Sequence, residues 1–220
     1  MTGQRDEVFN TIGLRGIRWA VACAAVGGAV ASGAEDTWRG LVVAPEHRCS
    51  AYDSNDYSYA QSLEVRIVAR LGDIFSPYTG RCFDDARETD IEHIVARSEA
   101  HDSGLCAADV ATRRRFAADL ANLTLASPEV NRYQKGAKDA SAWLPAQNRC
   151  WFANRIVDVR RKYGLTIDER EIDALEPLLA TCQSAELMTP DCTVAAGAGR
   201  FFRGWRLQLA DRDKRTPADR

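Results

Sequence analysis

Several features that mark common protein classes are missing from this 220-residue sequence. It carries no glycine-rich phosphate loop and no internal repeat, which argues against a P-loop nucleotide hydrolase and against a repeat scaffold. Its seven cysteines include no C-x-x-C pair, and no histidine lies at ligand spacing from a cysteine, which argues against a structural zinc site. A formal net charge of −2 does not by itself indicate a nucleic-acid-binding protein.

Long apolar runs are missing too, except near the N-terminus. Arg15 and Arg18 precede an apolar run over residues 19–30, and a cluster of small residues follows that ends at Ala34. This layout is typical of a secretory signal peptide, with cleavage expected after Ala34. An uncleaved membrane anchor is the alternative, but the run is short for a bilayer and its glycines weaken a spanning helix. We therefore predict a secreted or periplasmic protein without stable membrane association after cleavage.

Cysteine usage agrees with export. Removing Cys23 with the signal peptide leaves an even number of cysteines, which in an exported chain predicts disulfides. They are Cys49, Cys82, Cys106, Cys150, Cys182 and Cys192. The sequence does not choose among the possible pairings, and we predict Cys49 with Cys82, Cys106 with Cys150, and Cys182 with Cys192.

The composition, 45% hydrophobic and 27% charged, is that of a globular protein, and the length has room for one ordinary domain. We divide the chain into the signal peptide at residues 1–34, an irregular lead-in at 35–61, a folded domain at 62–185 and a polar, basic tail at 186–220. The tail is rich in small and charged residues, which is typical of poorly ordered segments. We expect a monomer.

Several helices are predicted inside the folded domain. Ser62 suits the cap of a helix that has Leu63, Ile67 and Leu71 on one face and ends at Gly72. The following segment, 74–83, reads as two short extended pieces around a turn. Further helices are predicted over residues 107–120, from Phe152 to Gly164, and onwards from a capping box at residues 166–169.

Two β-type runs, residues 90–95 and residues 122–126, stand on either side of a long excursion. After the second run, Ser127 is a good N-cap and Pro128 fits the first helical position, so a helix is predicted from there to about Lys135. Strand, long loop, strand and helix in this order predict a hairpin with a helix across it.

The two β-type runs carry residues suited to cleaving a phosphodiester, which requires a base, a cation and basic groups that hold the backbone. His93 suits the base because its unperturbed pKa lies near neutral pH. Glu92 and Asn131 offer the oxygen ligands that magnesium prefers. Adjacent strand residues point to opposite faces, so the strand must end or twist at Glu92 and His93 if both serve one site.

Basic residues are concentrated after Asn131. Residues 131–162 contain eight basic side chains against two acidic ones. Such a stripe attracts phosphate backbones, and on charge alone a solvated helix face is an equal alternative.

Three motifs carry a resemblance to a known family. They read D-I-E-H-I-V from Asp90, S-E-A-H-D-S-G from Ser98, and N-L-T-L-A-S-P-E-V-N-R-Y-Q-K-G-A-K-D-A-S-A-W-L-P from Asn122. In joint order and spacing they resemble the HNH nuclease superfamily with its ββα-metal core, and are most similar to small secreted bacterial HNH nucleases. The resemblance covers residues 78–145. It departs from the family pattern at Ala96, where proline is frequent, and at Asn131, where the family name has histidine.

The resemblance implies a role for each matching residue. His93 is the general base, and Asn122 is the catalytic-motif residue that holds the loop and the histidine in place. Glu92 and Asn131 are the metal ligands, and Asp90 is a further ligand or supports one. The nucleic-acid-binding residues are then Arg132 and Lys135 beside the phosphate, together with Lys138 from the basic stretch.

We predict an α+β fold with a ββα-metal core of a short hairpin and a helix, surrounded by additional helices. The predicted function is that of an exported endonuclease that hydrolyses DNA, or RNA, with one divalent cation, magnesium or manganese. The alternative is an exported, disulfide-rich module with a degenerate HNH fold that binds nucleic acid or a cell-wall partner without cutting. Hydrolysis of another exported phosphoester is a third possibility.

Overall fold

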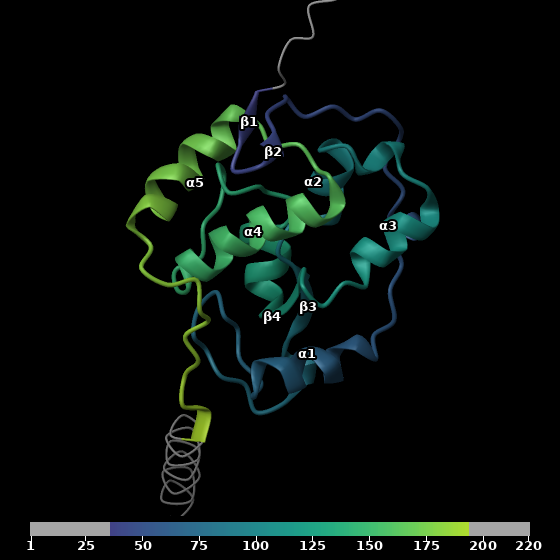
Figure 1. Ribbon diagram of the computed structural model, residues 1–220. Helices are drawn as coiled ribbons and strands as arrows, with labels where there is room; N and C mark the ends of the chain where they lie inside the picture. Colours follow the sequence, from purple (N-terminus) through teal and green to yellow (C-terminus); the bar gives the residue numbers. More distant parts are fainter. Residues whose placement is uncertain (1–35, 194–220) are drawn as a thin grey trace, which may run out of the picture. The chain divides into compact units, whose positions relative to one another are not determined.

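The computed structural model describes residues 36–193 (Figure 1). The predicted signal peptide and residues 194–220 of the predicted tail lie outside the described residues. Between residues 36 and 193, no helix is long and apolar enough to cross a membrane. The elements are β1 (Thr37–Trp38), β2 (Leu41–Val42), η1 (Ser54–Tyr57), α1 (Leu63–Leu71), η2 (Ala86–Glu88), β3 (Asp90–His93), α2 (Arg97–Asp102), η3 (Leu105–Ala107), α3 (Val110–Ala117), β4 (Leu123–Ala126), η4 (Glu129–Lys135), α4 (Arg149–Tyr163) and α5 (Glu169–Thr181).

A two-stranded antiparallel sheet of β3 and β4 lies among the helices (Figure 1). Its register pairs Asp90 with Ala126, Glu92 with Thr124 and His93 with Leu123. The segment between the strands forms helices of its own, and η4 follows β4 directly. Strand, excursion, strand and helix therefore occur in the predicted order, within an α+β fold.

Helix α1 covers one face of this hairpin. Leu63, Ile67 and Leu71 are its buried residues, and they pack in one cluster with Ile91 and Leu125. This is the predicted face, since residues three and four apart lie on one side of a helix. The helix ends at Gly72, whose φ of 85° places it in the left-handed region that favours glycine at a helix end. Ser62 makes no capping hydrogen bond with its side chain, contrary to the prediction.

Helices α4 and α5 belong to the larger core cluster. Phe152 and Ile156 of α4 pack there with Ala126 of β4 and Leu175 of α5. The prediction for the start of α5 is wrong in detail, because Asp168 rather than a threonine caps it. The Asp168 carboxylate accepts a 3.0 Å hydrogen bond from the Glu171 amide, which is the geometry of an N-cap.

Parts of the chain outside α1, α4 and α5 are more ordered than predicted. The lead-in contains the β1–β2 hairpin, and Leu41 of β2 is buried in the core. The long excursion holds α2, which was not predicted, and α3, which is shorter than expected and is capped by Asp109. At the start of the predicted tail, the Met188 amide donates to Asn148 at 2.8 Å, so this portion is held against the domain.

The six cysteines of residues 36–193 all form disulfides, as predicted, but the predicted pairing is wrong. The bonds join Cys49 to Cys106, Cys82 to Cys192, and Cys150 to Cys182. The prediction joined successive cysteines, whereas the fold joins positions that packing brings together. Cys150 lies in the first turn of α4 and Cys182 is the C-cap residue of α5, for example, and these two helices are in contact.

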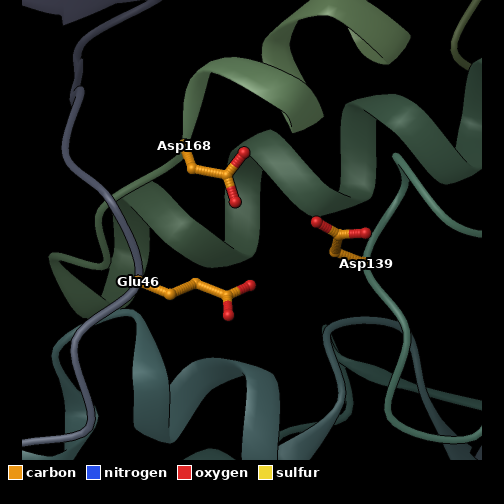
Figure 2. Close-up of side chains that lie close together, drawn as sticks. All are labelled: Glu46, Asp139 and Asp168. Carbon is orange, nitrogen blue, oxygen red and sulfur yellow. The ribbon is translucent and has the colours of Figure 1, made fainter.

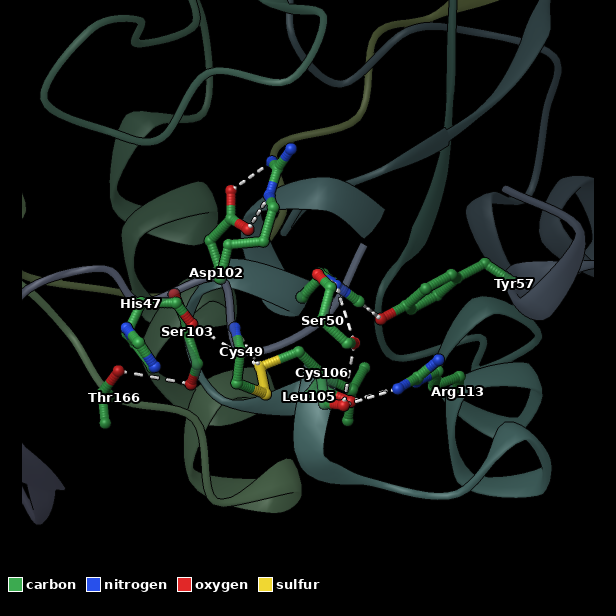
Figure 3. Close-up of a disulfide and its surroundings, with 12 residues drawn as sticks. His47, Cys49, Ser50, Tyr57, Asp102, Ser103, Leu105, Cys106, Arg113 and Thr166 are labelled. Atoms are coloured by element: carbon green, nitrogen blue, oxygen red, sulfur yellow. Dashed lines mark hydrogen bonds and ion pairs between the residues drawn. A yellow bond between two sulfur atoms is a disulfide. The ribbon is translucent and has the colours of Figure 1, made fainter. Parts of the chain in front are cut away.

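The Cys49–Cys106 bond stands in a densely hydrogen-bonded region (Figure 3). His101 is fully buried there, with Nδ1 at 2.8 Å from the Tyr57 hydroxyl. Arg113 is buried as well and donates to the carbonyl oxygens of Leu105 and Cys106. Both satisfy polar groups that would otherwise be buried without partners.

A second buried charge cluster joins α2, α4 and α5. The Arg160 guanidinium, on a side chain only 1% exposed, lies 2.6 Å from a Glu99 oxygen and 2.5 Å from a Glu171 oxygen. It also donates to the Ser103 hydroxyl and to the Thr166 carbonyl. These contacts satisfy a charge that would be costly to bury alone.

Candidate functional site

Glu92, His93 and Asn131 line one pocket of about 240 Å³. Strand β3 ends at His93, so the chain bends immediately after the two adjacent residues. That bend allows neighbours in sequence to reach the same cavity, although successive strand side chains leave opposite faces. The other lining residues are Tyr52, Tyr59, Ile91, Ala96, Arg97, Ser98, Gly136 and Ala137.

His93 is held in one tautomer. Its Nε2 lies 2.9 Å from the Ala117 carbonyl oxygen, which can only accept, so Nε2 carries the proton and Nδ1 carries the lone pair. The Tyr59 ring packs edge-on against the imidazole, with ring centroids 5.1 Å apart. Burial lowers the pKa of His93 to about 3, and the nearby charges of Arg97 and Lys135 add to this. The ring is therefore neutral at ordinary pH, and its Nδ1 lone pair is unprotonated.

Glu92 is buried and paired with a lysine from η4. Its Oε1 lies 2.7 Å from Lys135 Nζ, and Lys135 is itself 1% exposed. Lys135 Nζ also donates to the His93 carbonyl oxygen at 2.9 Å. Burial raises the pKa of Glu92 above its ordinary value, and the Lys135 ammonium offsets part of that rise. Lys135 thus does not lie at the surface, where the sequence interpretation placed it beside phosphate.

Asn131 is oriented by Asp90. The Asn131 amide nitrogen donates to Asp90 Oδ2 at 3.0 Å, which leaves the amide oxygen as the free acceptor of this side chain. Both Asp90 oxygens also accept from the Arg132 guanidinium, at 2.8 and 2.7 Å. The Asp90 carboxylate is therefore occupied by two side chains of η4, and its place is behind Asn131 rather than in the pocket.

Asn122 does not line the pocket, and its side chain instead clamps the backbone of Val95. Its amide oxygen accepts from the Val95 amide at 2.8 Å, and its amide nitrogen donates to the Val95 carbonyl at 3.0 Å. The residue is fully buried. The clamp fixes the chain two residues beyond His93, in agreement with a supporting rather than a chemical role.

Arg97 is a site residue that the sequence did not indicate. It lines the pocket, and its guanidinium lies 5.5 Å from the centre of the Tyr59 ring, in cation–π geometry. It donates to the Tyr57 carbonyl at 3.4 Å and pairs with no carboxylate of residues 36–193. Its proximity to His93 arises from the turn between β3 and α2, and no spacing rule would have shown it.

The predicted basic stripe is not wholly exposed, and several of its side chains have partners within the fold. Lys135 and Arg160 are buried in ion pairs, and Arg132 is tied to Asp90. Lys138 is exposed and donates to the Gln134 carbonyl at 2.6 Å. Lys162 pairs with Asp119. Two of the eight basic side chains are therefore buried, and several of the exposed ones are engaged by local partners.

Another carboxylate cluster lies away from this pocket. Figure 2 shows the side chains of Glu46, Asp139 and Asp168, from three separate segments, pointing towards one another. Oxygens of the three lie within 4.8 Å. Asp139 and Asp168 already accept hydrogen bonds from nearby backbone amides, at Ser141 and Glu171. Within residues 36–193, the group that could hold an ion contains carboxylates alone, which distinguishes it from the pocket at β3.

Sequence comparison gives the class of protein. Residues 49–176 match the family of the C-terminal domain of GmrSD restriction endonucleases. This range is more than half of the chain and contains every residue that lines the pocket at β3. The chain therefore belongs to this nuclease family, which implies a nucleic-acid substrate.

A further relative is a protein of Arthroderma benhamiae named "Uncharacterized secreted protein", which is 33% identical over 118 residues. The similarity covers 52% of this chain and 58% of that protein, so it spans little more than half of the relative's length. No solved structure matches the chain. A secreted relative and three disulfides agree with the predicted export, and the protein is an exported one.

Proposed function

We propose that the protein is an exported endonuclease of the HNH, ββα-metal type that hydrolyses phosphodiester bonds of nucleic acid. The observation that carries the proposal is the pocket at the end of β3, which joins a neutral imidazole to two oxygen-bearing side chains. The hairpin with a following helix supplies the scaffold, since β3 carries Glu92 and His93 and η4 carries Asn131.

A divalent cation fits the residues present. Glu92 and Asn131 would hold it, because a carboxylate and an amide oxygen are ligands of hard cations such as magnesium and manganese. The orientation of Asn131 supports this assignment, since its nitrogen is engaged by Asp90 and its oxygen is left as acceptor. When bound, the cation supplies a Lewis acid that stabilises negative charge on the phosphate and the leaving oxygen.

The chain's own residues then supply the base and the positioning. Nδ1 of His93 takes a proton from the attacking water, while the Ala117 carbonyl holds the ring through Nε2. Asn122 fixes the turn after β3 through Val95, and Asp90 fixes Asn131. In this proposal Arg97, which has no carboxylate partner in the described chain, takes the phosphate-binding role in place of Lys135.

One observation favours a second candidate, a nucleic-acid-binding module that does not cut. The 2.7 Å pair of Lys135 with Glu92 places a positive charge where a cation would have to approach the carboxylate. If this pair does not open, the fold binds nucleic acid and lacks hydrolytic activity. Binding of magnesium or manganese that depends on Glu92 would exclude this candidate.

The test is plasmid nicking by the oxidised protein with magnesium, with manganese and with EDTA, alongside His93→Ala and His93→Gln. We expect cation-dependent nicking that falls by roughly 10²–10⁴-fold in both variants, the range for losing an acid–base group. His93→Gln can retain the donor to Ala117 and serves as the variant that controls for packing. Nicking by either folded variant at the wild-type rate would overturn the mechanism. A folded wild type that binds DNA without nicking would favour the second candidate.

A further inference from the structure

A second, larger pocket abuts the end of the same hairpin. Its volume is about 480 Å³, and Ile94 and Leu123 form part of its wall. Ile94 follows His93 directly, and Leu123 is the register partner of His93. Residues adjacent to His93 in sequence and in register therefore line this pocket, which lies at the same end of the hairpin as the candidate cleavage site.

Two arginines from distant elements meet at this pocket. Arg70 comes from the last turn of α1 and Arg155 from the middle of α4. Arg70 donates to the Leu120 carbonyl, and neither guanidinium forms an ion pair with a carboxylate of residues 36–193. Burial and the charge of Arg155 both lower the pKa of Arg70, and the charge of Asp119 offsets part of this. The two arginines therefore repel each other across the pocket. An anion between them would remove that repulsion.

The remaining wall narrows the class of anion. Trp151 lines the pocket together with aliphatic side chains, which provides an apolar surface beside the two guanidinium groups. Arginine forks match the oxygens of a phosphate, and an indole is a common stacking partner of a nucleobase. Glu186 also lines the pocket and contributes one negative charge, which leaves the set of three net positive.

We propose that the pocket of Arg70, Arg155 and Trp151 binds a phosphate-bearing nucleotide unit, as a second nucleic-acid site beside the cleavage pocket. The phosphate lies between the guanidinium groups and the base or sugar lies on the apolar wall. The assignment to a substrate strand rests on the proposed nuclease function. Binding of a single nucleotide does not, because it requires neither His93 nor a cation.

The first experiment is calorimetric titration of the oxidised protein in EDTA with deoxyadenosine 5′-monophosphate and, separately, with deoxyadenosine. We expect the monophosphate to bind, the nucleoside to bind at least about tenfold more weakly, and Arg155→Ala to weaken the monophosphate by about tenfold or more. Arg155→Lys keeps the positive charge without the planar guanidinium. Its affinity for the monophosphate is expected to lie between those of wild type and Arg155→Ala. Arg66→Ala is the control. Arg66 is exposed, lies one turn before Arg70 on α1 and does not line the pocket.

An absence of monophosphate binding by the folded wild type, or equal binding by Arg155→Ala, would overturn the proposal. Titration with a single-stranded oligonucleotide, again in EDTA, distinguishes a nucleic-acid strand from a free nucleotide as the source of the phosphate. If a strand occupies the pocket, Arg155→Ala reduces the slope of log affinity against log salt by about 0.7 per lost phosphate contact. An unchanged slope would overturn the strand assignment and leave a free-nucleotide site. Because cleavage is not the readout, failure here and failure of the nuclease proposal are distinguishable.

Discussion

Two of the places where the protein buries positive charge against carboxylates differ in what lies beside them. Arg160 sits between Glu99 and Glu171 and also donates to a hydroxyl and a carbonyl, so both terminal nitrogens of its guanidinium are engaged inside the helical core. Lys135 meets Glu92 at the edge of a pocket that also holds a histidine. A buried ion pair thus stabilises the packing of helices around Arg160. In our proposal, the pair at Lys135 holds Glu92 in its ionised form until a metal ion replaces the ammonium.

Breaking the ion pairs of Arg160 gives the largest expected effect on stability. Arg160→Met leaves Glu99 and Glu171 buried without a cation, so we expect the free energy of unfolding to fall by about 3–5 kcal/mol. Chemical denaturation of the oxidised protein measures this. A change below about 1 kcal/mol would contradict a stabilising role for the cluster.

The ion pair of Lys135 with Glu92 is expected to be sensitive to divalent cations, unlike the ion pairs of Arg160. Lys135→Met leaves Glu92 unpaired, so the variant is expected to be less stable than wild type in EDTA. Adding manganese at about 100 times its dissociation constant should then recover about 2.7 kcal/mol, since a cation can replace the ammonium. Thermal unfolding with and without manganese measures the recovery. Equal stability of Lys135→Met in both conditions would mean that no cation reaches Glu92.

The acidic surroundings of Arg160 predict a smaller, pH-dependent effect. Burial raises the pKa of Glu171 to about 7, although Arg160 acts to lower it, and burial with the Glu99 charge raises that of Glu46 to about 7. An unfolded glutamate releases its proton near 4.5, so the folded chain holds more protons in between. The free energy of unfolding should therefore fall as pH rises through this range, by roughly 1–2 kcal/mol between about pH 5.5 and 7.5.

Denaturation at both pH values, with Glu171→Gln as the comparison, checks this dependence. The glutamine variant cannot titrate at this position, so its stability should vary less with pH than that of wild type. Stability that rises with pH in the wild type would contradict the sign.

Local signals in the sequence predicted the parts of the fold that depend on neighbouring residues. The spacing of Leu63, Ile67 and Leu71 predicted α1 and its buried face, and glycines marked the ends of α1 and α4. The order of the motifs predicted one site for Glu92, His93 and Asn131, and these residues line one pocket. These features follow from helical and strand periodicity or from motif spacing, and both can be read directly from the order of residues in the sequence.

Features that depend on packing between distant segments were missed. Lys135 and Arg160 look like ordinary surface charges in a basic stretch, and only the fold shows that each has a buried carboxylate partner. The pairing of Cys150 with Cys182 follows from how α4 and α5 pack. Arg97 reaches the pocket because of the turn after β3. None of these has a local signal, because each partner is far away in sequence or is set by loop geometry.

The comparison between the two regions is tested most directly by the same chemical change in both. Glu92→Gln and Glu99→Gln each remove one buried carboxylate charge beside a cation. Plasmid nicking with manganese and thermal unfolding would be measured on both proteins and on wild type. We predict that Glu92→Gln loses nicking by roughly 10²–10³-fold while folded, whereas folded Glu99→Gln nicks normally. Both variants are expected to unfold at lower temperature than wild type, because each leaves a buried cation with one carboxylate charge fewer beside it. Wild-type nicking by folded Glu92→Gln would contradict the account.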